Sequence, residues 1–276
     1  MRFRLFRKEI KFHVFVWAII FVLMWPLVYM VSCSFKDLGQ IFSSGLNLIP
    51  NPGTAENYER VFSTIPFWRY VKNSVTIAGG VAVAKAITSI LAGYVFSFID
   101  FKHRDKLFYL FTVTMFIPFT VIMIPNYLTL AKMNLINNPI GVMLPQLGDA
   151  MGIFLMRQSM RTIPKSLVEV ARLDKVGHVR TLTRIVVPLC KSSIFAMFIM
   201  FFINSWNEYF WPMLILTRRD NYTLTLAMQM FLSSEGGSAW GSTMALAALA
   251  TFVPLLAYLI SQRFIIRSYI TSGIKE

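Results

Sequence analysis

A charged segment, residues 169–188, lies between two long apolar segments and contains Arg172, Lys175, Arg180 and Arg184. A Lys or Arg near the centre of a bilayer costs at least ~2.5–3.5 kcal/mol, so this segment must lie in water. The chemistry open to such side chains is charge pairing with another molecule. A solvated helix–turn–helix between two membrane spans therefore indicates contact with another protein.

One face of the first helix in this segment combines apolar, small and acidic side chains. The helical pattern begins after Pro164, and Leu167, Val170, Ala171 and Asp174 recur at three- and four-residue spacing. Ala171 would allow close approach of a partner. The alternative is a solvated loop held by lipid phosphates, which would suit its basic residues.

A second set of polar residues lies inside apolar segments. Asn204, Asn207 and Glu208 share one helical face at i, i+3 and i+4, and Gln146 and Asp149 interrupt an earlier apolar segment. Polar groups at membrane depth are costly unless they are paired or face water, and amides and carboxylates can bind the polar groups of a solute. These five residues are candidates for a solute pathway. The alternatives are helix-to-helix contacts, a helix cap for Asp149, or a solvated position for Glu208.

Lys85 lies within another apolar segment and therefore needs a carboxylate, a carbonyl or water beside it. A structural pairing is the favoured interpretation over a transport role.

The sequence lacks the usual signatures of catalysis and of metal binding. His13, His103 and His178 are not clustered with acidic residues at metal-ligand spacing. The chain contains neither a GxxxxGK[ST] phosphate loop nor a GxSxG elbow. We therefore predict no catalytic residue, no metal and no cofactor, and a protein that is not an enzyme.

Composition indicates an all-α membrane protein. Of 276 residues, 56% are hydrophobic, and the mean hydropathy is +0.58. The net charge of +14 would suggest nucleic acid on a soluble protein, but here the basic residues cluster between apolar segments, as membrane topology requires. Cys33 and Cys190 are expected near opposite sides of the bilayer, so we predict no disulfide between them.

Six segments are long enough to cross ~30 Å of hydrocarbon. They are residues 13–31, 73–99, 107–131, 139–156, 192–216 and 243–266.

The distribution of basic residues predicts the orientation of these spans. Nineteen Lys and Arg residues lie in the segments on one side and seven on the other, which places both termini and the loop after the fourth span in the cytoplasm. We divide the chain into residues 1–69, a first span with an outer connection, and residues 70–276, a five-span core. The outer connection contains a candidate helix over residues 54–62, with Thr54 as its cap.

The spacing of Glu169, Ala171, Ile185 and Pro188 resembles the EAA loop of permease subunits of ABC importers. The pattern of that family is roughly E-A-A, three residues, G, nine residues and I-x-L-P.

Three positions of this chain differ from the pattern. Val170 replaces the first Ala, Lys175 stands in the Gly position, and Val187 replaces Leu. Gly177, two residues after Lys175, is therefore the candidate residue for the turn.

Residues 202–212, which include Trp206-Asn207-Glu208, resemble the fifth span of carbohydrate-importing, maltose-type permeases. Shorter matches to the same subfamily are Lys72-Asn73-Ser74, Ile117-Pro118, Ile124-Pro125, Leu135-Ile136-Asn137, Arg157-Gln158 and Ser272-Gly273-Ile274-Lys275.

This resemblance implies a six-span permease of a prokaryotic cytoplasmic membrane that imports a sugar. Its partners would be a homologous permease subunit in a heterodimer, two cytosolic ATPase subunits that bind ATP and Mg, and an extracytoplasmic solute-binding protein. The loop at about 161–188 would be the coupling loop. Its ATPase-coupling residues would be Glu169, which can pair with a basic partner, Val170, Ala171, Leu173, Asp174 and Gly177.

By the same resemblance, the outer loop 217–241 would reach toward the binding protein; the alternative is an unengaged loop. Three other functions stay open: an ABC permease for a non-sugar solute, a stand-alone secondary transporter or channel, and a membrane enzyme. We detect no internal repeat of the kind that secondary transporters often contain.

Overall fold

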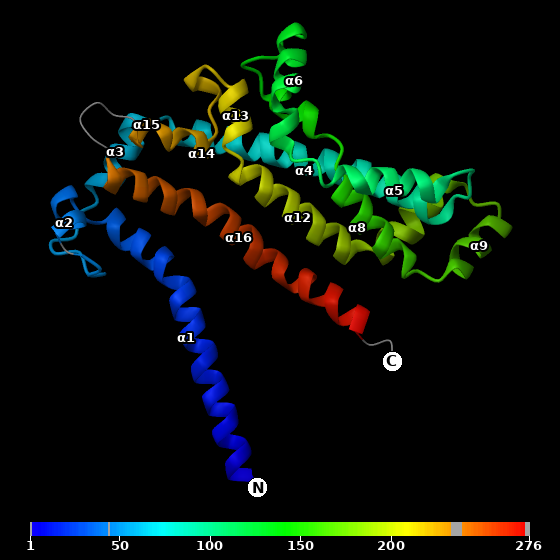
Figure 1. The fold of residues 1–276 in the computed structure, drawn as a ribbon, viewed down its shortest axis with the longest axis horizontal. Helices are drawn as coiled ribbons and strands as arrows, with labels where there is room; N and C mark the ends of the chain where they lie inside the picture. Colours follow the sequence, from blue (N-terminus) through cyan, green and yellow to red (C-terminus); the bar gives the residue numbers. More distant parts are fainter. Residues whose placement is uncertain (1, 44, 233–238, 274–276) are drawn as a thin grey trace. The chain divides into compact units, whose positions relative to one another are not determined.

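The computed structural model describes residues 2–43, 45–232 and 239–273, with side chains for the part of these segments within residues 11–262. The described residues form helices joined by turns, with no strand among them (Figure 1). The helices of nine residues or more are α1 (Arg2–Ser34), α3 (Glu56–Thr64), α4 (Phe67–Phe98), α5 (Arg104–Thr114), α6 (Phe119–Lys132), α8 (Ala150–Arg161), α9 (Lys165–Leu173), α12 (Lys191–Asn207) and α16 (Trp240–Gly273).

Shorter helical elements connect them. They are α2 (Leu38–Ser43), α7 (Pro139–Met143), the 3₁₀ turn η1 (Leu144–Gln146), α10 (His178–Thr181), the π-helix η2 (Leu182–Val186), α11 (Val187–Leu189), α13 (Phe210–Ile215), the 3₁₀ turn η3 (Arg219–Asn221), α14 (Leu224–Ala227) and α15 (Gln229–Leu232).

Three helices of the described chain are long and apolar enough to cross a membrane: Lys11–Ser34 of α1, α4, and Trp240–Gln262 of α16. Three further pairs of helical segments pass the same test together but are bent by 92°, 51° and 83° at short breaks. The number of spans is therefore three, or up to six if each bent pair crosses once. The all-helical membrane fold is confirmed; the count of six and the orientation of the termini stay predictions. The bent pairs are Arg104–Thr114 with Phe119–Lys132, Pro139–Gln146 with Ala150–Arg161, and His178–Leu189 with Lys191–Asn207.

Two of the three breaks have a residue with extended backbone directly before the second helix. Pro118, in an extended conformation, precedes α6. Asp149, also extended, precedes α8, and its Oδ1 accepts the Gly152 N–H at 2.9 Å. The alternative in which Asp149 caps a broken helix is thus confirmed.

The expectation that Asn204, Asn207 and Glu208 share one helical face is wrong for Glu208, which lies outside the helix. Helix α12 ends at Asn207 and α13 begins at Phe210. Pro212 supplies the physical reason, because it has no N–H to bond the Glu208 carbonyl and its ring would clash with that group. Glu208 is accordingly extended at this break.

One compact unit comprises residues 1–67 and 227–252. In this unit α1 exposes its apolar side chains, and Trp17 and Leu23 are 68% and 69% exposed, as a span that contacts lipid or another apolar surface requires. The candidate helix at residues 54–62 is confirmed as α3. Its cap position is Ala55, whereas the Thr54 hydroxyl accepts the Glu56 N–H at 3.1 Å.

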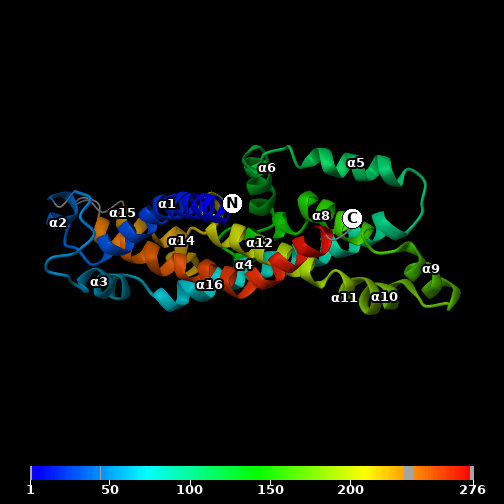
Figure 2. The ribbon, with the colours of Figure 1, turned by 90° about the horizontal axis from the view of Figure 1, so that it is seen from below.

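The other unit comprises residues 68–226 and 253–276. It contains α4, α8 and α12, which are labelled in Figure 2, and these helices pack closely at two glycines. A Cβ atom at Gly93 of α4 would lie 2.7 Å from the Cβ of Met156 on α8. One at Gly152 of α8 would lie 2.2 Å from the Ser89 hydroxyl and 2.6 Å from the Phe201 ring on α12. The three helices therefore approach at distances that larger residues would not allow.

We predict that Gly93→Ala lowers the free energy of unfolding by about 1–3 kcal/mol, because the added methyl group overpacks the contact between α4 and α8. Thermal unfolding of the detergent-purified protein measures the change. Gly79→Ala is the matched control on the same helix, since a Cβ at Gly79 meets nothing within 4 Å and Ala favours a helix over Gly. Equal stability of the two variants would contradict the close approach.

Candidate functional site

Helix α9 presents one face to the protein core and the other to the outside. Val168 and Ala171 are buried, and Val168 belongs to the apolar cluster that the ends of α4, α8 and α12 share. On the opposite face, Leu167, Val170 and Leu173 are 45%, 54% and 81% exposed. Three exposed aliphatic side chains on a charged helix form an apolar ridge that is suited to be covered by a partner.

The other predicted coupling residues occupy different positions around α9. Ala171 packs against its own chain, so the close approach that it allows is within the protein. Asp174 is exposed and ends the helix. Gly177 is exposed, has an extended backbone and directly precedes α10.

The turn after α9 is built on Lys175 and not on Gly177. Lys175 has a φ of 55°, in the left-handed region, whereas Gly177 has a φ of −65° that any residue adopts. The Val176 N–H bonds the Ala171 carbonyl at 2.8 Å, and the Lys175 N–H bonds the Arg172 carbonyl at 3.0 Å, which is the Schellman arrangement. The hypothesis that Gly177 supplies the turn is therefore wrong. The left-handed conformation, which glycine favours, occurs at Lys175, the residue that stands in the glycine position of the EAA pattern.

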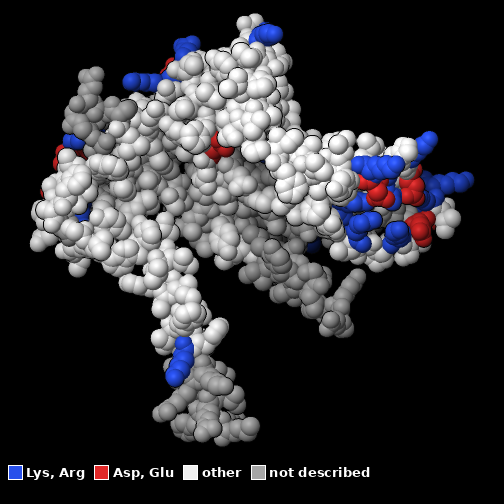
Figure 3. Space-filling model, viewed as in Figure 1, with Lys and Arg blue, Asp and Glu red and all other residues white. Residues whose placement is uncertain are grey.

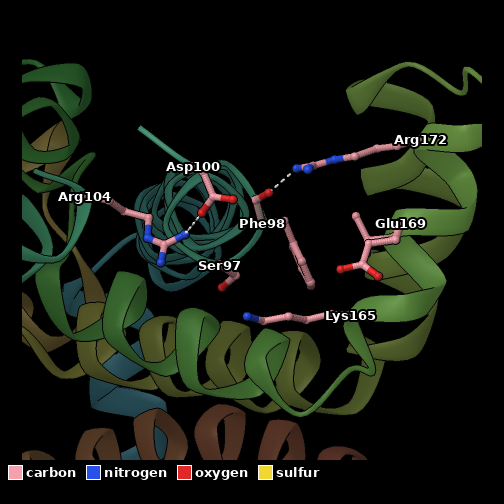
Figure 4. A pocket seen from close by; sticks show the side chains of 8 residues that line it. Ser97, Phe98, Asp100, Arg104, Lys165, Glu169 and Arg172 are labelled. Atoms are coloured by element: carbon pink, nitrogen blue, oxygen red, sulfur yellow. Dashed lines mark hydrogen bonds and ion pairs between the residues drawn. The ribbon is translucent and has the colours of Figure 1, made fainter. Parts of the chain in front are cut away.

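Glu169 points into a small cavity between α9 and the end of α4 (Figure 4). The cavity holds about 100 Å³, which is too small for a sugar. Arg172 donates to the Phe98 carbonyl across it, and Arg104 pairs with Asp100 at 2.6 Å. Among the described residues, Glu169 forms no ion pair, so its carboxylate can receive a partner cation. The lining residues are Ser97, Phe98, Asp100, Arg104, Lys165, Val168, Glu169 and Arg172.

Charged residues gather around this end of the unit (Figure 3), and one of them is buried. Arg157 of α8 is 5% exposed; its guanidinium pairs with the Asp105 carboxylate of α5, lies 3.8 Å from the centre of the Phe108 ring, and donates to the Phe96 carbonyl of α4 at 3.2 Å. Arg157 thus joins three helices. The sequence indicated Arg157 only as part of a family match, because its partners are distant along the chain.

A larger cavity, of about 620 Å³, collects the predicted pathway residues. Gln146, Asp149, Asn204 and Glu208 all line it, although the first two come from the break before α8 and the other two from the last turn of α12 and the residue after it. Asn207 does not line it and is exposed at the end of α12. The full lining is Lys85, Thr114, Met115, Ile117, Phe119, Ile122, Pro145, Gln146, Gly148, Asp149, Ala150, Met151, Asn204, Ser205 and Glu208.

An ion pair lies at the wall of this cavity. Lys85 Nζ is 3.0 Å from Asp149 Oδ2, and the two side chains are 16% and 22% exposed. The prediction that Lys85 needs a carboxylate, a carbonyl or water beside it is confirmed, and the partner is a carboxylate. The ammonium group also lies 5.3 Å from the centre of the Phe201 ring. Since Asp149 compensates Lys85, the carboxylate of Glu208 is the uncompensated charge in the lining.

Glu208 lines the cavity and also accepts a hydrogen bond at the start of the next helix. Its Oε1 accepts the Trp211 N–H at 3.3 Å at the start of α13. Ser205 and Thr114 also line the cavity, and the sequence analysis missed both. Ser205 follows Asn204 directly, but Thr114 ends α5 and is far along the chain from the other polar lining residues, so no local pattern connects it with them.

Comparison with known proteins decides the family. The family described as "Binding-protein-dependent transport system inner membrane component" matches residues 85–270. The chain belongs to this family. It is therefore the permease component of a binding-protein-dependent importer, and the prediction of that class is confirmed.

Individual relatives agree with this assignment. The chain is 30% identical to the sn-glycerol-3-phosphate transport system permease protein UgpE of Escherichia coli O1:K1, over 91% of this chain and 92% of the relative. It is also 30% identical to UgpE of Yersinia pestis bv. Antiqua, over 96% of both chains. The fold is similar to a chain in the crystal structure of a bacterial ABC transporter involved in the import of the acidic polysaccharide alginate, with a TM-score of 0.81, 21% identity, and 93% and 95% of the two chains covered.

We predict that Lys175→Gly raises the stability of the permease by about 1 kcal/mol, because a left-handed φ costs a residue with a side chain roughly 1–2 kcal/mol more than glycine. Thermal unfolding in detergent measures the shift. Gly177→Ala is the control and should leave stability unchanged, since its φ suits alanine and a Cβ there meets nothing within 4 Å. A loss of stability in Lys175→Gly would contradict the turn geometry.

Lys85→Met should destabilise the permease by about 3–5 kcal/mol, because it leaves the largely buried Asp149 carboxylate without its cation. Adding Asp149→Asn should restore most of the loss, since asparagine removes the charge and still caps α8. Unfolding temperatures of the single and double variants measure both effects. If the double variant were no more stable than Lys85→Met, the ion pair would not be the cause.

Proposed function

We propose that this permease forms one half of the solute pathway of an ATP-driven importer of sugars or oligosaccharides and that α9 docks on a cytosolic ATPase subunit. The observation that carries the proposal is the exposed ridge of Leu167, Val170 and Leu173 beside the unpaired Glu169. An apolar ridge with a charge at its edge has the composition of a protein interface. Membership of the permease family supports the same conclusion.

The packing of α9 supports a rigid mechanical link. Val168 of α9, Val186 of η2, and Tyr94, Met156 and Phe201 of the three packed helices belong to one buried cluster. Close-packed clusters transmit displacement with little compression, so movement of α9 would move the helices that line the cavity. Partner ATPases would bind ATP and Mg, and their closure would move the two permease halves between inward- and outward-facing states.

The cavity supports a polyhydroxyl solute. Its volume of about 620 Å³ lies within the range of small-molecule sites, and Gln146, Asn204, Ser205 and Glu208 offer amide, hydroxyl and carboxylate groups to hydroxyls. The second candidate is a non-sugar solute such as sn-glycerol-3-phosphate, which the names of the UgpE relatives support. ATPase activity of the reconstituted importer, measured with neutral oligosaccharides and with sn-glycerol-3-phosphate in the presence of its binding protein, discriminates between them.

The same proposal includes the membrane arrangement. Six spans with both termini in the cytoplasm agree with the excess of Lys and Arg in the segments on one side, and a second, homologous permease would complete the pathway in a prokaryotic cytoplasmic membrane. A stand-alone secondary transporter is less well supported, because it needs no exposed ridge on α9. Solute flux through the lone chain in liposomes would favour that alternative.

We predict that Leu173→Glu lowers the amount of ATPase subunit that co-purifies with the permease and the solute-stimulated ATPase activity by roughly 10-fold, since it puts a charge on the most exposed side chain of the apolar ridge. Thr183→Glu is the matched control, because it adds the same charge at an exposed position of the same loop. Normal assembly and transport of Leu173→Glu would contradict docking through α9.

A further inference from the structure

The loop after α13 is fastened to the start of α4. The Asn73 amide donates to the carbonyls of Asp220 and Tyr222, each at 3.0 Å. The Ser74 hydroxyl is buried and accepts the Leu224 N–H at 2.8 Å. The two residues belong to the Lys72-Asn73-Ser74 motif, so this motif holds a loop about 150 residues further along the chain.

A second set of hydrogen bonds holds the same loop from the other side. The Asn137 N–H donates to the Ile215 carbonyl at 2.7 Å, and its Oδ1 accepts the Arg218 N–H at 2.9 Å. The Asn221 amide donates to the Asn137 carbonyl at 2.7 Å. Asn137 has a φ of 60°, a conformation that asparagine tolerates better than most residues. With backbone groups of the loop bonded on both sides, residues 215–224 form a preorganised surface.

This surface is strongly basic. Arg69, Lys72, Arg218 and Arg219 are exposed, and we call these four residues the basic edge. Asp220, which belongs to the same loop, pairs with Arg69 at 2.8 Å. The described residues provide no ion pair to Lys72, Arg218 or Arg219. Figure 3 shows Lys and Arg atoms on the loop that follows α13.

Neither folding nor topology explains these charges. Their side chains make no described contact that stabilises the loop, apart from the Arg69–Asp220 pair, and an exposed pair contributes little. In the predicted topology they lie on the side where Lys and Arg are normally depleted. Uncompensated charges on a fixed surface instead steer a partner of opposite charge and speed its association.

We propose that the basic edge docks an acidic surface of the solute-binding protein. This inference rests on the proposed function, in which the edge lies on the outer side, and it adds which residues of the permease receive the binding protein and by which chemistry. The preorganised geometry favours a folded protein over lipid, because lipid headgroups require no fixed arrangement of side chains. The binding protein is the partner on which this family depends.

The test uses the complete importer in nanodiscs together with its own binding protein. We measure the concentration of binding protein that gives half-maximal ATPase stimulation, at about 50 mM and about 300 mM salt, where screening differs strongly. The double variant Arg218→Gln/Arg219→Gln should raise this concentration roughly 3- to 10-fold at low salt and respond less to salt than the unaltered importer. Arg60→Gln, on α3 and exposed, is the control and should change neither value.

The outcomes separate this inference from the proposed function. Stimulation that is present but unaffected by the double variant would overturn the inference and leave the proposed function standing. No stimulation of the unaltered importer at either salt concentration would overturn both. An effect of the double variant that disappears when anionic lipid is replaced by zwitterionic lipid would assign the edge to lipid and likewise overturn the inference.

Discussion

The Lys85–Asp149 ion pair is the interaction on which the architecture around the cavity depends. An ammonium group inside an apolar helix has no stable position without compensation, and Asp149 supplies it from the break before α8 at 3.0 Å. The same carboxylate caps α8 through the Gly152 N–H. The Thr88 hydroxyl lies 2.8 Å from the Leu147 carbonyl and adds a second link between α4 and this break. One ion pair therefore fixes where the helix breaks and how it meets α4.

Close packing extends this local constraint toward α9. Gly152 and Gly93 bring α4, α8 and α12 together, and the buried cluster continues from these helices to Val168 on α9. Arg157 adds polar links from α8 to α4 and α5. The polar cavity and the exposed ridge of α9 thus belong to one packed unit. This arrangement supports the proposed coupling between a cytosolic ATPase subunit and the solute pathway.

Local sequence patterns predicted where the helices lie better than they predicted where the helices break or turn. The apolar segments, the helix after Pro164 and the cap at Asp149 follow from periodicity, composition and capping preference, which act over a few residues. The break at Glu208 contradicts the predicted helical face of Asn204, Asn207 and Glu208, although Pro212 in the sequence indicates that a helix ends nearby. The turn after α9 was assigned to Gly177 because glycine favours a left-handed φ, yet the chain places Lys175 there. Helix packing and the hydrogen bonds of the turn outweighed that local preference.

By itself, the sequence determined the class of protein: an apolar helical chain with a charged loop between its spans, and motifs that resemble binding-protein-dependent permeases. These properties depend on composition and on spacing along the chain. The tertiary structure alone decided which polar residues meet: Gln146 and Asp149 with Asn204 and Glu208, Lys85 with Asp149, and Asn73 and Asn137 with the loop after α13. The physical reason is that these contacts join residues far apart in sequence, and only the packing of the helices sets the distance between them.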